Sequence, residues 1–227
     1  MKWCVVGANG NMGRKHDMAL LKAGYSAVLN VDIGDDIYPG MDGYTVATPI
    51  NTHYGIIHEI VNIYQPKYIV CEKPCGGSLE ESAKIVSMCE ANDVTLITSY
   101  QRRMDPTLRM LRDRSQDIKV ICKMDFEHSC HAFDMRFWYG PRCEIELCED
   151  ISTGRALEVT VNDKIIPRAL DYALVEFYRN LKITRLNNMC VGKQTLNPHY
   201  INEYTSDLWR EAGEGKTVSF SGLHRTG

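Results

Sequence analysis

Alternating strand-like and helix-like segments in the first half of the chain constrain its fold most strongly. Five short apolar runs predict strands at residues 2–8, 26–32, 43–49, 67–72 and 94–100. Helical patterns lie between or after them, at residues 12–25, 53–65, 78–93 and 105–113. Such alternation is typical of an α/β fold with a parallel sheet covered by helices on both faces. Residues 32–44 are too few for a crossover helix and another strand, so we expect a sheet of five strands.

The pattern changes after residue 114. Alternating or β-branched runs predict antiparallel strands at residues 117–127, 142–150, 155–163 and 216–222. Helical periodicity remains at residues 165–181 and 198–215. We therefore expect two domains, a parallel-sheet domain over 1–114 and a smaller α+β domain with a mostly antiparallel sheet over 115–227.

Composition excludes several classes of function. The net charge of -3 provides no basic surface for nucleic acid. No apolar run approaches the roughly 20 residues that span a membrane, and the N-terminal segment lacks signal-peptide features, so we expect a cytoplasmic protein with no membrane partner. The nine cysteines form no CxxC pair, and Cys130 with its neighbours His128 and His131 lacks a second ligand pair. We expect reduced, mostly buried thiols and no metal site.

The segment "VGANGNMG" places three glycines, Gly7, Gly10 and Gly13, between the first predicted strand and the first helix. Such a turn lets the backbone approach a pyrophosphate at the helix N-terminus, although the same spacing also occurs in plain strand-to-helix turns. Asp32 ends the second predicted strand, where an acid can bind ribose hydroxyls and repel a 2'-phosphate. We expect a dinucleotide site that prefers NAD(H), with NADP(H) as the alternative. Its predicted turn contacts are Gly7, Asn9, Gly10, Asn11 and Met12.

Four motifs of the first half, "VGANGNMGRKH", "VATPINTH", "VCEKP" and "SYQRRMDP", resemble those of the Gfo/Idh/MocA oxidoreductase family in order and position. The resemblance implies a Rossmann-type fold. It adds further cofactor contacts at Thr48, Pro49, His53, Glu72, Lys73 and Gln101. Members are usually longer, so the chain resembles a shortened member.

The second half resembles the family through "EHSCHAFDMRFWYGP", which is similar to a D-x-x-x-H-x-x-D helix. Glu127 stands where the family has aspartate, followed by His131 and Asp134. The resemblance implies that Lys73 carries the proton of a substrate hydroxyl, that His131 shares the relay, and that Glu127 orients its ring. It also implies substrate contacts by Arg102, Arg103 and Asp134, and a cis bond between Lys73 and Pro74. Taken alone, each of these side chains has an ordinary structural interpretation, Lys73 as a solvated charge at a strand end.

Three functions follow from these expectations. The first is NAD(H)-dependent hydride transfer to or from a sugar, cyclitol or nucleotide-sugar carbon. The alternatives are reduction of another substrate, such as a bile pigment, and non-catalytic sensing of a dinucleotide. The family also implies a homodimer through the second domain, where an apolar sheet face would otherwise be exposed.

Overall fold

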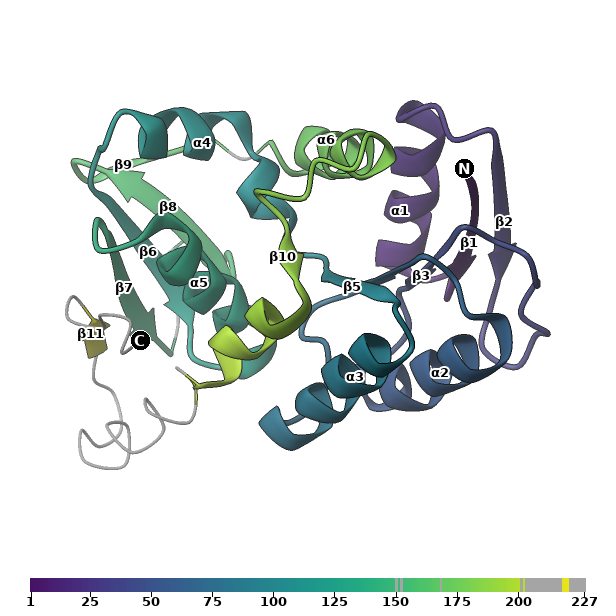
Figure 1. Ribbon diagram of the computed structural model, residues 1–227. Coiled ribbons are helices and arrows are strands. Elements are labelled where there is room, and N and C mark those ends of the chain that lie inside the picture. The colour runs from purple at the N-terminus through teal and green to yellow at the C-terminus, as the bar shows by residue number, and fades with distance from the viewer. Residues whose placement is uncertain (150, 152, 168, 201, 203–217, 221–227) are drawn as a thin grey trace. The chain divides into compact units, whose positions relative to one another are not determined.

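The computed structural model describes residues 1–149, 151, 153–167, 169–200, 202 and 218–220 (Figure 1). The chain divides into two compact units. The first comprises Met1–Met104 and Leu170–Leu196, and the second comprises Asp105–Ala169 and Asn197–Gly227. The sequence predicted one boundary, at residue 114. In the structure the first unit gives way to the second after Met104, and residues 170–196 return to the first unit.

The first unit is built on a six-stranded sheet with the order β10-β5-β4-β3-β1-β2. Its strands are β1 (Lys2–Val6), β2 (Ala27–Val31), β3 (Gly43–Val46), β4 (Tyr68–Cys71), β5 (Thr95–Thr98) and β10 (Cys190–Val191). Strands β1 to β5 pair in parallel, which confirms the five predicted strands. The expected total of five strands is wrong, because a sixth strand, β10, pairs antiparallel with β5. Strand β10 has only two residues, too few for a periodic pattern.

Helices cover both faces of this sheet (Figure 1). One face carries α1 (Asn11–Lys22) and α6 (Leu170–Lys182). The other carries α2 (His53–Glu59), its π-helical continuation Ile60–Tyr64, and α3 (Leu79–Ala91). Because side chains alternate along a strand, Trp3 of β1 packs on the first face and Cys4 on the second. Each face therefore has its own buried core, as the apolar strands predicted.

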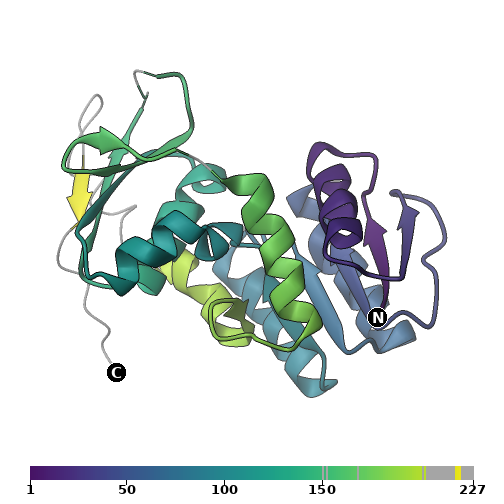
Figure 2. The ribbon, with the colours of Figure 1, turned by 90° about the horizontal axis from the view of Figure 1, so that it is seen from above.

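Helix α6 belongs to the first unit, although its sequence lies deep in the predicted second domain. It packs against α1, and Figure 2 shows the two helices side by side. Phe177 and Tyr178 of α6 are almost fully buried in the same core as Trp3 and Leu20. The core beneath α1 is thus completed by residues from the far end of the chain.

The second unit contains a five-stranded sheet with the order β11-β7-β6-β8-β9. Its elements are α4 (Pro106–Asp113), β6 (Ile118–Lys123), α5 (Phe126–Tyr139), β7 (Cys143–Cys148), β8 (Leu157–Val161), β9 (Lys164–Ile165) and β11 (Val218–Phe220). The sheet is mostly antiparallel, as predicted. The β6–β7 pair is parallel because α5 forms the crossover between them. The helix predicted over 198–215 lies largely outside the described residues.

The face of this sheet away from α5 is largely polar in its described part, although Ile121 of β6 also lies on it. Strands β6 and β7 alternate buried and half-buried residues. The half-buried set includes Lys119 and Glu146, whose Nζ and Oε2 atoms lie 2.5 Å apart. The apolar outer face that the sequence suggested for dimer contacts is therefore absent from these two strands. No helix among the described residues is long and apolar enough to cross a membrane.

Candidate active site

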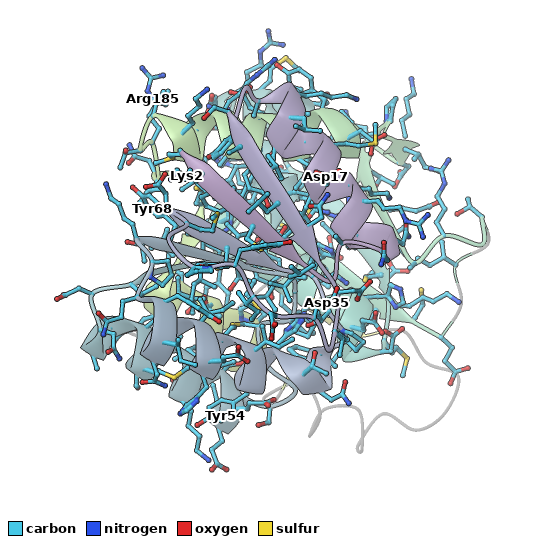
Figure 3. All side chains as sticks on the ribbon, turned by 90° about the vertical axis from the view of Figure 1, so that its right-hand side faces the viewer. Lys2, Asp17, Asp35, Tyr54, Tyr68 and Arg185 are labelled. Carbon is cyan, nitrogen blue, oxygen red and sulfur yellow. The ribbon has the colours of Figure 1, made fainter. Side chains whose placement is uncertain are left out.

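The predicted cofactor residues gather where the five parallel strands end, called here the carboxyl end of the sheet. Figure 3 labels Lys2 at the start of β1 and Asp35 in the loop after β2, at opposite ends of the strands. Backbone bonds join neighbouring loops at the carboxyl end: Glu72 N donates to Val46 O (2.8 Å) and Ser99 N donates to Cys71 O (2.8 Å). Open α/β sheets bind their ligands at this end.

The glycine turn after β1 is too tight for side chains. Gly7 has a φ of +85°, and a Cβ there would lie 2.8 Å from the carbonyl oxygen of Ala47. A Cβ on Gly13 would lie 2.0 Å from the carbonyl oxygen of Gly7. Glycine at both positions lets the first turn of α1 approach the end of β1 closely. The tight turn that the glycines predicted is present.

The N-terminus of α1 is open. Asn9, Gly10 and Asn11 are exposed, Gly10 is the N-cap without a side-chain hydrogen bond, and the first turn holds no acid. The guanidinium of Arg14 donates two hydrogen bonds to Asn9 O, from Nε (2.9 Å) and from Nη2 (2.6 Å), and these bonds hold the turn in place. Uncapped N–H groups and the positive end of the helix dipole suit an anion such as a pyrophosphate.

An acidic loop follows β2. Asp32 is half-buried, its Oδ1 accepts from Ile33 N (2.8 Å), and its own N donates to Asp35 Oδ2 (2.8 Å). Residues 31–41 contain three aspartates and no lysine or arginine. This charge suits the hydroxyls of a ribose and opposes a 2'-phosphate.

His53 joins two loops of the carboxyl end. It is 1% exposed, with Nε2 2.9 Å from Thr48 O and Nδ1 3.1 Å from Cys75 O. Both ring nitrogens thus face protein carbonyls. The histidine, expected to contact a cofactor, connects the loop after β3 to the loop after β4.

Lys73 follows β4 at the carboxyl end and is half-buried. Its bond to Pro74 is cis, which confirms what the resemblance implied. The neighbouring Glu72 carboxylate is buried, with Oε1 2.7 Å from Nε2 of His16 and Oε2 accepting from Lys73 N over 3.3 Å. Burial alone would raise the pKa of Glu72, but the hydrogen bond with His16 and the charge of Lys73 hold that pKa below its ordinary value. Glu72, expected to contact a cofactor, hydrogen-bonds within the protein.

The buried polar side chains that adjoin Glu72 were not predicted from the sequence. Nδ1 of His16 lies 2.7 Å from the hydroxyl of Tyr178, and that hydroxyl lies 2.7 Å from Oγ1 of Thr45. Trp3 Nε1 donates to the same Oγ1 over 2.7 Å. A histidine on the buried face of α1 was the one available signal, since nothing in the sequence connects Tyr178 with this end of the chain.

The turn Gln101–Met104 follows β5, and all four of its residues are buried. Arg103 Nη1 donates to Met189 O (3.0 Å) and to Gln194 Oε1 (3.0 Å), which joins this turn to the returning segment of the first unit. Gln101 Oε1 is buried without a hydrogen-bond partner among the residues that the structure describes. An orphaned acceptor of this kind fits a donor group on a ligand.

The remaining predicted residues lie on α5 of the second unit. Asp125 caps the helix, with Oδ1 accepting from His128 N over 3.1 Å. Glu127 is exposed in the first turn, His131 is half-buried one turn later, and Asp134 is 1% exposed. That these residues share one helix agrees with the motif they resemble. Lys73, with which His131 was expected to share a proton, belongs to the first unit.

No group of three or more histidine, cysteine, aspartate or glutamate side chains suited to a metal ion occurs within the described part of the chain. All nine cysteines are free thiols, and eight of them are buried.

The chain resembles known proteins over part of its sequence. No family model matches the chain. The rhizopine catabolism protein MocA of Rhizobium meliloti is 43% identical over 81 residues, which cover 35% of this chain and 25% of MocA. The chain matches a quarter or less of the length of its curated relatives.

Solved structures extend the likeness over nearly the whole chain. A putative myo-inositol dehydrogenase of Sinorhizobium meliloti has a TM-score of 0.70 at 14% identity, with 96% of this chain and 99% of that one covered. The WlbA dehydrogenase of Thermus thermophilus, solved with NAD and UDP-GlcNAcA, has a TM-score of 0.66 at 14% identity, with 90% and 94% covered. At these identities the structures show a shared fold. The sequence match to MocA and the shared fold agree with the resemblance of the motifs to the Gfo/Idh/MocA family.

Proposed function

We propose that the chain is an NAD(H)-dependent oxidoreductase that moves a hydride between nicotinamide and the hydroxyl or keto carbon of a sugar, cyclitol or nucleotide-sugar. The observation that carries the proposal is the gathering of the glycine turn, Asp32 and Lys73 at one carboxyl end of a parallel sheet. The names of the relatives point in the same direction, since WlbA was solved with NAD and a UDP-sugar.

The residues at the carboxyl end fit a dinucleotide. Gly7 and Gly13 leave a cradle that side chains would fill, and the uncapped N-terminus of α1 suits the pyrophosphate. Asp32 would accept hydrogen bonds from a ribose, and Gln101 Oε1 offers a buried acceptor. When bound, the dinucleotide supplies the acceptor or donor of the hydride. The acidic loop favours NAD(H) over NADP(H).

Lys73 is the proposed proton carrier. During oxidation of an alcohol, its neutral amine takes the hydroxyl proton while the hydride leaves the carbinol carbon. During reduction, its ammonium returns a proton to the oxygen. The flanking Glu72 carboxylate places a fixed negative charge beside this step. His131 would share the proton, Glu127 would orient its ring, and the substrate contacts would come from Arg102, Arg103 and Asp134. The protein would act as a homodimer.

Spectrophotometry at 340 nm tests the proposal. The pure protein is incubated with NAD+ and a panel of polyols, sugars and UDP-sugars. We expect turnover with one class of these substrates, and a loss of at least 100-fold in kcat for Lys73→Met with NAD+ binding retained. Lys84→Met is the matched control, because Lys84 is an exposed lysine of α3 that pairs with Glu80.

Three outcomes separate the alternatives. Unchanged kcat in Lys73→Met would exclude this lysine as the proton carrier. Tight NAD+ binding without turnover on any substrate would favour the dinucleotide sensor. Turnover with a bile pigment but with no hydroxyl substrate would favour the other reductase.

A further inference from the structure

A chain of buried, hydrogen-bonded polar side chains ends next to Lys73, the proposed proton carrier. We call it the His16 relay, and its members are Trp3, Thr45, Tyr178, His16 and Glu72. Successive members are joined by four contacts of 2.7 Å. Every member is 5% exposed or less. They come from β1, β3, α6, α1 and the loop after β4, so no single element explains their meeting.

The chemistry of the members gives the relay a direction. An indole N–H can only donate, so Thr45 accepts from Trp3. Thr45 then donates its own hydroxyl proton to Tyr178, and Tyr178 donates to Nδ1 of His16. A neutral His16 keeps its proton on Nε2 and donates it to the Glu72 carboxylate. In this order each hydrogen is used once, and all of them point toward Glu72.

The reverse order leaves a conflict. If His16 carried protons on both nitrogens, its Nδ1–H would donate to Tyr178, whose hydroxyl would then turn toward Thr45. Thr45 would accept from both Trp3 and Tyr178, and its own hydrogen would have no acceptor within the relay. A buried donor without an acceptor is costly.

We propose that Tyr178 and His16 are positioning residues that keep Glu72 ionised and fixed beside Lys73, so that the charge of Glu72 sets the pH range in which Lys73 exchanges its proton. The inference rests on the proposed function. Four titratable groups interact with Glu72: His16 from α1, Tyr178 from α6, Cys71 from β4, and Lys73, the next residue in the chain. With a neutral His16, Lys73 is the one cation among these four groups.

The geometry favours this role over simple packing. A buried carboxylate costs free energy unless it is paired, and an apolar residue would fill the same space at lower cost. Glu72 instead accepts from His16 with one oxygen and from the backbone N of Lys73 with the other. The charge is thus held on the residue immediately before Lys73.

The kinetic test uses the pH profile of kcat/KM for alcohol oxidation. Because a carboxylate favours the ammonium form of a neighbouring lysine, Glu72→Gln should lower the midpoint of the rising limb by about one pH unit. His16→Gln should move it in the same direction. In the double variant the midpoint should match that of Glu72→Gln alone, since His16 acts through Glu72.

Leu20→Ala is the matched control, because Leu20 is fully buried on α1 in the same core but lies outside the relay. It should lower the Tm and leave the midpoint unchanged. A midpoint that stays in place in Glu72→Gln, or that moves equally in Leu20→Ala, would overturn the inference.

A second measurement needs no turnover. Two-bond ¹⁵N–¹H NMR of the cofactor-free protein should show His16, assigned by its loss in His16→Gln, with the proton on Nε2 at pH 8. Tyr178→Phe should change the ¹⁵N–¹H cross-peaks of His16, because Nδ1 loses the hydroxyl that donates to it. A proton on Nδ1 would refute the order of the relay. Absence of turnover in the wild type would instead refute the proposed function, and with it the catalytic part of this inference.

Discussion

Replacing Gly13 by alanine should damage the glycine turn more than any other single added methyl group there. The new Cβ would lie 2.0 Å from the carbonyl oxygen of Gly7 and 2.8 Å from Cα of Ala8. Both neighbours are backbone atoms, so no side chain can move aside. Relieving the closer contact needs a backbone shift of about 1 Å, and overpacking of this kind costs about 3 kcal/mol, at the upper end of the usual range.

For a protein of this size, about 3 kcal/mol corresponds to a fall in Tm of roughly 6–12 °C. The shift would also move the turn that is proposed to hold the pyrophosphate. We therefore expect Gly13→Ala to lose NAD+ affinity by at least tenfold, because both the close approach and the open helix N-terminus depend on the same backbone.

Gly55 provides the matched control. It lies within α2, and a Cβ there would have no heavy atom within 4 Å. Gly55→Ala should therefore stabilise the protein by about 0.5–1 kcal/mol through helix propensity and leave NAD+ affinity unchanged. Differential scanning calorimetry and isothermal titration measure both quantities. A Gly13→Ala protein with wild-type Tm and wild-type affinity would refute the argument from close approach.

Two further predictions follow from single side chains. His199 is buried against the ring of Phe126, and burial lowers its pKa from 6.5 to about 4, so the folded state binds fewer protons than the unfolded state between these values. Stability should be complete above pH 6.5 and fall by about 3 kcal/mol as the pH drops to 4, whereas His199→Phe should flatten this dependence in urea titrations. Asp32→Ala should weaken NAD+ binding about tenfold and reduce the preference for NAD+ over NADP+. If titration shows that both affinities are unchanged, Asp32 does not belong to the site.

The glycine turn and the strand ends could be predicted because they depend on local chemistry. Gly7 needs a positive φ, and the tight approach at Gly13 excludes any side chain, so the residue type itself records the backbone conformation. The strands of the first sheet are apolar throughout because both faces are buried, and this pattern places Lys73 at the end of β4. Local signals therefore located the carboxyl end of the sheet.

The placement of α6 could not be predicted, because periodicity shows that a helix has an apolar face but not what that face will cover. The pattern of residues 165–181 correctly predicted a helix, but that helix packs in the first unit and not in the second domain where it was expected. The same limit applies to the hydrogen bonds of Arg103, which joins Met189 and Gln194. Such contacts depend on residues more than 80 positions away in the chain.

The return of α6 changes which residues make up the proposed dinucleotide-binding unit. Tyr178 is buried in the core beneath β1, and its hydroxyl also lies 2.7 Å from Nδ1 of His16, the histidine that contacts Glu72. Without α6, Trp3 would lose buried apolar neighbours and His16 would lose the partner of Nδ1. Glu72 would be affected in turn, because its Oε1 lies 2.7 Å from Nε2 of His16. The motifs at the carboxyl end therefore specify the positions of the proposed reactive residues, whereas a helix from the distant half of the chain completes the polar group next to Glu72.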